Sequence, residues 1–295
     1  MLIMSRYNGR FKKWHYLCTR YIVALSALPS RNNKKSTKLE IRIMTEKEMY
    51  NLINSQNGQS SNGFAVNEKE RGLSGVFSAL MRKVYTWMTL ALVITGVTAY
   101  GVASSPTLLM TLMTSRGLLF GLIIAELALV FIITGALNRL SLSTATLLFI
   151  IYSVLNGAML SSVFAVYTMT SIAKVFFITA GTFGAMAFYG YTTKKDLTSL
   201  GKILFMALIG LIIATVVNMF LKSSGFEYIL SYAGVAIFVG LTAWDSQKIK
   251  MMLQTQYDMS EGAQKLALIG ALTLYLDFIN LFLYLLRIFG GSNKD

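Results

Sequence analysis

The chain has 295 residues, 55% of them hydrophobic and 14% charged. This excludes an ordinary water-soluble domain, which averages about a quarter charged residues. The net charge of +14 reflects 27 Lys and Arg residues against 13 Asp and Glu residues. Ten of the Lys and Arg residues precede residue 44, and most others lie near the ends of apolar segments. This distribution indicates membrane topology and attraction to lipid headgroups, and it argues against a nucleic-acid partner.

Residues 1–75 are polar and basic, and we expect them to form a disordered extension. Their one apolar patch, 21–28, is too short to span a bilayer. No convincing cleavage site follows the patch, so a secretion signal is disfavoured. A translation start at Met44, just before the sequence MTEKEMYN, is an alternative that would remove much of the excess positive charge.

Seven apolar segments follow Arg82 and Lys83, and they predict one compact all-α membrane bundle over residues 76–291. Each has around twenty residues, enough at about 1.5 Å per residue to cross a hydrocarbon core of roughly 30 Å. Runs of this length favour helices over the short alternating strands of a barrel. The connections are mostly short, so neighbouring helices run antiparallel. The segments are 85–104, 117–137, 143–167, 172–191, 202–221, 228–248 and 264–287.

Lys and Arg are divided unequally between the two sets of segment ends. Ten lie on the side that includes the start of the first segment, and five lie on the other side. Because positive residues concentrate on the cytoplasmic side of a membrane, this predicts a cytoplasmic N-terminus. With seven spans, the C-terminus then lies on the opposite side of the cell inner membrane.

Small residues recur at the four-residue spacing of helix contacts, as in Gly117 with Gly121 and Gly157 with Ser161. This spacing favours close packing of helices. A phosphate-binding loop is not indicated, because no Lys-Ser or Lys-Thr follows at the required distance. The same faces leave open a regulatory protein that acts by binding other membrane proteins.

Three acidic residues lie inside apolar segments: Glu126 in the second, Asp245 toward the end of the sixth and Asp277 near the middle of the seventh. A charged carboxylate there costs from a few to more than about ten kcal/mol, so such residues normally face the bundle interior and mark ion or proton paths. The alternative is a protonated or Arg-paired acid that only holds helices together.

Asp245 and Asp277 can approach each other if the seventh helix is surrounded by the others. The sixth segment places Asp245 within about one turn of the cytoplasmic surface, and Asp277 lies roughly 18 Å of helix rise beyond Lys265. Two carboxylates in a low-dielectric site cannot both ionise cheaply, so the pair would be a pH-dependent latch. Arg139, at the cytoplasmic end of the second segment, is the candidate counter-ion that keeps the helices closed, unless it is only a positive-inside residue.

Calcium is the cation that such groups suit. It takes about six to eight oxygen ligands, which Asp245, Asp277 and further carboxylate, hydroxyl, carbonyl or water oxygens could supply transiently. A thiolate or imidazole site is excluded, because Cys18 and His15 both lie in the N-terminal extension. We therefore expect weak calcium passage, with calcium and protons as the species handled and with no bound cofactor.

Two stretches around the aspartates are distinctive: GLTAWDSQKI at 240–249 and LYLDFINLFLYLLRIFG at 274–290. With the order of the seven segments and a KKDL loop at 194–197, they make residues 76–291 resemble the transmembrane Bax inhibitor motif family, in its bacterial form.

The resemblance implies a seven-helix fold whose last helix is wrapped by the other six. It also implies a calcium leak gated by pH through two aspartates, which match Asp245 and Asp277 here. Bacterial members further have an acidic residue in the second helix and an arginine that latches onto the first aspartate. Glu126 and Arg139 are the matching residues in this chain.

Other functions use the same acidic residues. A proton-coupled transporter is poorly separated from a leak by sequence. An intramembrane aspartyl protease would also need two aspartates on adjacent helices. Such proteases carry a Gly-x-Gly-Asp signature around the second aspartate, whereas in this chain Leu-Tyr-Leu precedes Asp277. Serine proteolysis is disfavoured because the only histidine, His15, lies outside the bundle. We therefore expect no enzymatic activity.

Overall fold

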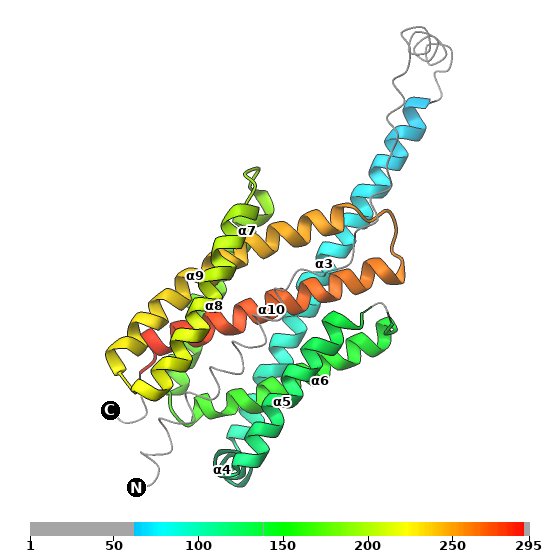
Figure 1. Ribbon diagram of the computed structural model, residues 1–295. Helices are drawn as coiled ribbons and strands as arrows, with labels where there is room; N and C mark the ends of the chain where they lie inside the picture. Colours follow the sequence, from blue (N-terminus) through cyan, green and yellow to red (C-terminus); the bar gives the residue numbers. More distant parts are fainter. Residues whose placement is uncertain (1–61, 138, 292–295) are drawn as a thin grey trace.

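The computed structural model describes residues 62–137 and 139–291, and this part of the chain is helical almost throughout (Figure 1). No strand occurs among these residues. Eight helices make up the described chain: α3 (Asn62–Ala103), α4 (Pro106–Thr114), α5 (Arg116–Gly135), α6 (Leu142–Phe164), α7 (Met169–Thr192), α8 (Thr198–Leu221), α9 (Ser224–Gln254) and α10 (Glu261–Phe289). All of them except α4 are long and apolar enough to cross a membrane, which confirms the predicted all-α bundle of seven spans.

Helix ends differ from the predicted segment ends where polar residues continue a helix. α3 begins at Asn62, inside the extension 1–75 that we expected to be disordered; residues 1–61 lie outside the described chain. α9 continues to Gln254, beyond the expected end at 248. Hydropathy marks the part of a helix that suits lipid, whereas Glu, Lys, Arg and Gln extend helices readily. The short helix α4 was not predicted; it begins with Pro106, a residue favoured at the first helical position.

Side-chain caps set the beginnings of four helices. In each case a hydroxyl oxygen of the residue before the helix accepts a hydrogen bond from a backbone N–H in the first turn, which is otherwise without a partner. The caps are Ser141 for α6, Thr168 for α7, Ser223 for α9 and Ser260 for α10.

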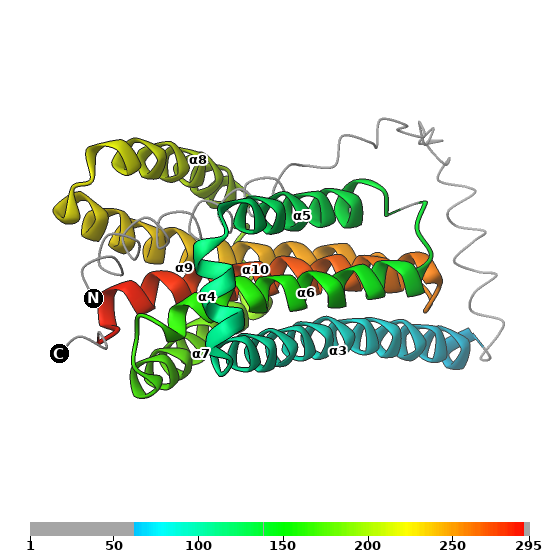
Figure 2. The ribbon, with the colours of Figure 1, turned by 90° about the horizontal axis from the view of Figure 1, so that it is seen from below.

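The last helix, α10, is the most buried of the seven spans. From Ala267 to Leu286 all side chains except Ile269 and Thr273 are buried. α10 packs against α9, α3, α7 and α6, while α8 packs on α9 and α5 packs on α6. Figure 2 shows α5 and α8 on one side of α10 and α3 and α7 on the other. Polar groups on α10 are therefore enclosed by other helices.

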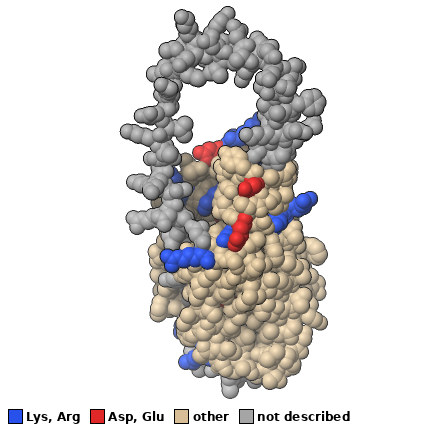
Figure 3. Space-filling view, turned by 90° about the vertical axis from the view of Figure 1, so that its right-hand side faces the viewer, with Lys and Arg blue, Asp and Glu red and all other residues tan. Residues whose placement is uncertain are grey.

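The outer surface is largely apolar. Phe177, Met206 and Phe220 are each at least 70% exposed. Figure 3 shows most of the described charged side chains on this face gathered toward one end of the bundle, above a broad and largely uncharged surface. An apolar belt of this kind is suited to lipid tails rather than water, so the surface agrees with the seven spans.

The glycines at helix-packing spacing have different surroundings. A side chain at Gly157 of α6 would collide with the Thr95 backbone and the Thr98 side chain on α3. Gly117 and Gly121 of α5 have nothing within 4 Å of the position that a Cβ would occupy. Gly157 therefore serves packing inside the bundle and is not available to a partner protein, whereas the α5 glycines face open space.

Candidate functional site

Asp245 of α9 and Asp277 of α10 lie together in the bundle interior. Their carboxyl groups are close enough to interact directly, and they are only 6% and 2% exposed. Oδ2 of Asp277 has no hydrogen-bond partner among the described residues. An ionised carboxylate can only accept a hydrogen bond, so a hydrogen bond between the two acids would require a proton on one of them.

The register of α9 against α10 brings the two aspartates opposite each other. Gly234 of α9 lies against the ring of Tyr284, and Ile249 lies against Gly270 of α10. Asp245 falls between these two contacts on the antiparallel pair. The helix continues for nine residues after Asp245, about 2.5 turns, and the exposed Lys248 lies one turn after the aspartate. The expected depth of Asp245, about one turn from the membrane surface, stays a prediction.

Helix α7 supports α9 beside the aspartate pair. The Ser246 hydroxyl donates a hydrogen bond to the Ala187 carbonyl oxygen at 2.8 Å. Gly190 of α7 lies directly against the backbone of Ala243, where no larger residue has room. Two contacts to one helix, on either side of Asp245 in the sequence, hold α9 in place here.

Gln247 ties the loop between α7 and α8 to α9, a role that sequence reasoning missed. Its Oε1 accepts a hydrogen bond from the Leu197 N–H at 2.8 Å, and its Nε2 donates to the Lys195 carbonyl at 2.7 Å. Lys250 adds a hydrogen bond from Nζ to the Tyr191 carbonyl at 2.7 Å. Gln247 belongs to the motif at 240–249, and its position two residues after Asp245 was the sequence signal that could have indicated a role beside the site. A movement of α9 at Asp245 would reach this loop directly.

Lys248 is a positive charge that acts on both aspartates, and it too was missed as a site residue. It is exposed, and its Nζ lies 5.0 Å from the centroid of the Trp244 ring. Trp244 in turn fills the space beside Gly201 of α8. Lys248 follows Asp245 by three residues, a spacing that puts two side chains on one helix face.

Arg139, the predicted latch, is exposed in the connection between α5 and α6. No described acidic residue lies within salt-bridge distance of it. The salt bridges among the described residues join Lys265 with Glu261 and Arg287 with Glu227. The structure therefore does not bring Arg139 to Asp245, and its role as a latch stays a prediction.

Glu126 of α5 lies elsewhere in the interior. It is 1% exposed, and its Oε1 has no hydrogen-bond partner among the described residues. Its charge would act on Tyr275 of α10. Tyr275 precedes Asp277 by two residues, about 200° around the helix, so Glu126 lies on a different side of α10 from the aspartate pair.

Tyr275 belongs to a buried hydrogen-bond chain that sequence reasoning did not find. The Thr95 hydroxyl of α3 donates to the Ser153 carbonyl of α6 at 3.0 Å. The Tyr275 hydroxyl lies 2.7 Å from the same Thr95 oxygen and is therefore its donor. Three helices meet in this chain of contacts.

The acidic residues expected to bind calcium are thus divided into a pair and a single residue. Among the described residues there is no group of three or more His, Cys, Asp or Glu side chains that could hold a metal ion. Asp245 and Asp277 offer four carboxylate oxygens, and calcium takes about six to eight, so water or other groups would have to complete the shell of an ion passing here. Calcium binding at this pair stays a prediction.

Comparison with known proteins extends over nearly all of the helical bundle. Residues 78–294 match the sequence profile of the family described as "Inhibitor of apoptosis-promoting Bax1". The chain belongs to the Bax inhibitor family. This confirms the resemblance read from the motifs at 240–249 and 274–290, and both aspartates lie within the matched residues.

Bacterial members of the Bax inhibitor family are close in sequence. The chain is 52% identical over 213 residues to the inner membrane protein YbhL of Escherichia coli (strain K12), covering 72% of this chain and 91% of YbhL. It is 47% identical over 217 residues to protein RP147 of Rickettsia prowazekii (strain Madrid E), covering 73% and 90%. A protein of Borreliella burgdorferi is 46% identical over 215 residues, covering 73% and 93%.

Family membership and the seven apolar helices together establish an integral membrane protein of the Bax inhibitor family. The likeness to YbhL agrees with a place in an inner membrane, because YbhL is named as an inner membrane protein.

Proposed function

We propose that the chain is a pH-sensitive calcium leak channel controlled by the Asp245–Asp277 pair. The observation that carries this proposal is the juxtaposition of two buried acids on α9 and α10 in a member of the Bax inhibitor family. Deeply placed carboxylates mark ion and proton paths in membrane proteins. Glu126, on another side of α10, is proposed as a further acid along the path.

A change of proton number at the pair supplies the gating step. With one shared proton the acids would hold each other and leave Arg139 disengaged; the closeness of the two acids and the exposure of Arg139 support this arrangement. With both acids ionised, their repulsion favours an outside positive charge, which Arg139 would supply by closing onto Asp245. Acidification favours the first arrangement, so we propose that it speeds the leak. Lys248 is the other charged group that acts on the pair.

The proposal is tested by calcium influx into liposomes that contain the full chain and an enclosed calcium indicator. Influx is recorded between about pH 5 and 8 for the wild type and for Asp245→Asn with Asp277→Asn. These isosteric changes keep hydrogen-bonding groups at both positions but remove the titrating protons. We expect wild-type influx to rise on acidification and the double variant to lose this response.

Two other results would redirect the assignment. If the double variant keeps the full pH response, the aspartates are not the sensor. If neither protein moves calcium while an enclosed pH indicator reports proton movement with an added solute, a proton-coupled transporter is the better description.

One observation supports a second candidate, a regulatory protein that binds other membrane proteins through α5. Gly117 and Gly121 face open space on that helix, where a partner helix could approach closely. Gly117→Leu with Gly121→Leu would abolish such an activity and leave calcium influx unchanged. The aspartate variants would have the opposite effects.

A further inference from the structure

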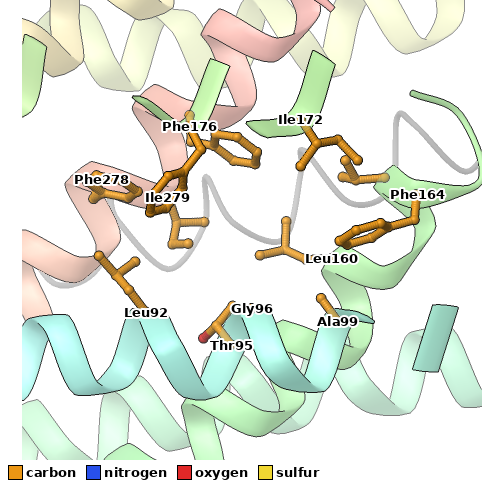
Figure 4. A pocket seen from close by; sticks show the side chains of 12 residues that line it. Leu92, Thr95, Gly96, Ala99, Leu160, Phe164, Ile172, Phe176, Phe278 and Ile279 are labelled. Atoms are coloured by element: carbon orange, nitrogen blue, oxygen red, sulfur yellow. The ribbon is translucent and has the colours of Figure 1, made fainter. Parts of the chain in front are cut away.

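A pocket of about 100 Å³ lies between α3, α6, α7 and α10 (Figure 4). Leu160 of α6, Ile172 and Phe176 of α7, and Phe278 of α10 contribute to its walls, and Gly96 of α3 forms part of its floor in the view of Figure 4. Residues from four spans thus surround a space that none of them fills.

The walls offer no free polar group to a ligand. Thr95 is the one polar side chain among the lining residues, and its hydroxyl is already engaged by the Ser153 carbonyl and by Tyr275. All other lining side chains are aliphatic or aromatic. A polar ligand would lose its hydrogen bonds to water without replacement, so the chemistry of the walls selects hydrocarbon.

The mouth of the pocket lies on the outer surface of the spans. Gly96 and Phe176 are exposed, whereas Phe278 and Ile279 deeper in the pocket are buried. The neighbouring surface carries Val97, 67% exposed, and Phe177, 73% exposed. Since this surface belongs to membrane-spanning helices, the medium at the mouth is lipid tails.

Depth along α3 agrees with entry of a lipid tail. Tyr100 lies one turn beyond Gly96, close to the helix end at Ala103. Its ring makes an edge contact with the ring of Phe164 in the pocket wall, with the two ring centroids 6.3 Å apart. Tyrosines favour the level of lipid headgroups. Gly96 lies seven residues before the end of α3, about 10 Å deeper than the end, where acyl chains begin.

We propose that this pocket binds one acyl chain of a membrane phospholipid, which enters sideways between α3 and α7 past Gly96 and Phe176. Its volume compares with that of about 150 Å³ for an apolar cavity that admits benzene, so it takes a stretch of a few methylene groups. The bound chain contacts Phe278, the residue next to Asp277, and so reaches the helix of the aspartate pair. The site itself does not depend on the proposed calcium leak.

Photo-crosslinking tests the site directly. The full chain is reconstituted in phosphatidylcholine vesicles that contain a phosphatidylcholine with a diazirine in one acyl chain, illuminated, and mapped by mass spectrometry. We expect labelling of the buried residues Phe278 and Ile279 in addition to the exposed Phe177. Labelling of Phe177 with none at Phe278 and Ile279 would show that no acyl chain enters, and would overturn the proposal.

A matched pair of variants tests the route of entry. Gly96→Leu fills the mouth, and because no atom lies within 4 Å of the Cβ position the change causes no collision. It should remove labelling of Phe278 and Ile279 while Phe177 stays labelled. Gly101 lies on the same helix and also has open space around its Cβ position, but it is outside the pocket. The Gly101→Leu variant should therefore be labelled at the same residues as the wild type.

Further outcomes keep the test decisive. Phe176→Ala widens the mouth at an exposed position and should increase the labelling of Phe278, so the proposal remains testable even if Gly96→Leu does not fold. Equal labelling of Phe278 in the wild type and in a folded Gly96→Leu would overturn it. The proposal would also be overturned if a diazirine sterol labelled Phe278 and Ile279 and excess phosphatidylcholine did not reduce that labelling. The occupant of the pocket would then be a different lipid.

Discussion

Asp196 and Asp258 are the acidic side chains outside the spans whose surroundings favour their charged form. Hydrogen bonds from Thr198 lower the pKa of Asp196, with a smaller contribution from the positive charge of Lys202. Hydrogen bonds from Ser260 lower the pKa of Asp258 in the same way. Both carboxyls contribute stability that is present above their ordinary pKa and is lost only as the pH falls through the lowered value.

A control for the pH response follows from the sign of these shifts. Because the pKa of Asp196 is lowered, its charge does not change between about pH 5 and 8. Asp196→Asn should therefore leave the pH dependence of calcium influx in liposomes unchanged, although it removes a carboxylate from the loop that Gln247 binds. A shift of the influx profile in this variant would assign the pH response to the loop instead of the buried pair.

The hydrogen bond between Thr95 and Tyr275 gives a second prediction for single residues. Thr95→Val leaves the Tyr275 hydroxyl without its partner in a buried site, and we expect a loss of about 0.6–2 kcal/mol in the free energy of unfolding. The double variant with Tyr275→Phe removes both groups and should be more stable than the sum of the two single losses implies. Thermal unfolding in detergent measures all three variants. Strict additivity would show that the two hydroxyls do not interact.

Among the elements, α7 and α9 make the closest helix contact beside the aspartates. Gly190 and the Ala243 backbone touch because glycine has no Cβ, and the Ser246 hydrogen bond lies on the same interface. Close approach of this kind substitutes for the hydrophobic driving force that lipid does not provide between helices. The height of Asp245 in the bundle thus depends on a glycine in another helix.

Gly190→Ala tests this dependence. The added methyl group overlaps the Ala243 carbonyl, so we expect the variant to lose roughly 1–3 kcal/mol of stability. Gly184→Ala is the matched control, because it is exposed on the same helix and has nothing within 4 Å of the new Cβ. Thermal unfolding of the two variants in one detergent isolates the packing effect from the gain in helix propensity that both share. Equal unfolding temperatures would contradict the proposed contact.

For the whole molecule, the part that could be predicted is the part encoded by local composition. Long runs such as that from Gly117 to Gly135 give the spans, and the motifs around Asp245 and Asp277 give the pair. What escaped prediction depends on contacts between distant segments. The register of α9 against α10, the binding of the 193–197 loop by Gln247 and the separation of Glu126 from the aspartates all arise from how tilted helices pack, which hydropathy does not encode.

The orientation of the bundle in the membrane follows from the distribution of positive charge. Ten Lys and Arg residues at one set of helix ends against five at the other predict a cytoplasmic N-terminus. Cys18 is the only cysteine, so Cys18→Ser provides a background for single reporters. Ser199→Cys and Ser224→Cys introduce the same exposed thiol near opposite ends of α8.

A membrane-impermeant maleimide applied to Escherichia coli cells with a permeabilised outer membrane then reports which thiol faces outward. The first end of α8 shares its side with the start of α3, because two antiparallel pairs of spans separate them. We expect Ser224→Cys to react in intact inner membranes and Ser199→Cys to react only after lysis. The reverse pattern would place the Lys-rich end outside, and it would mean that any proton sensed at the aspartate pair enters from the opposite compartment.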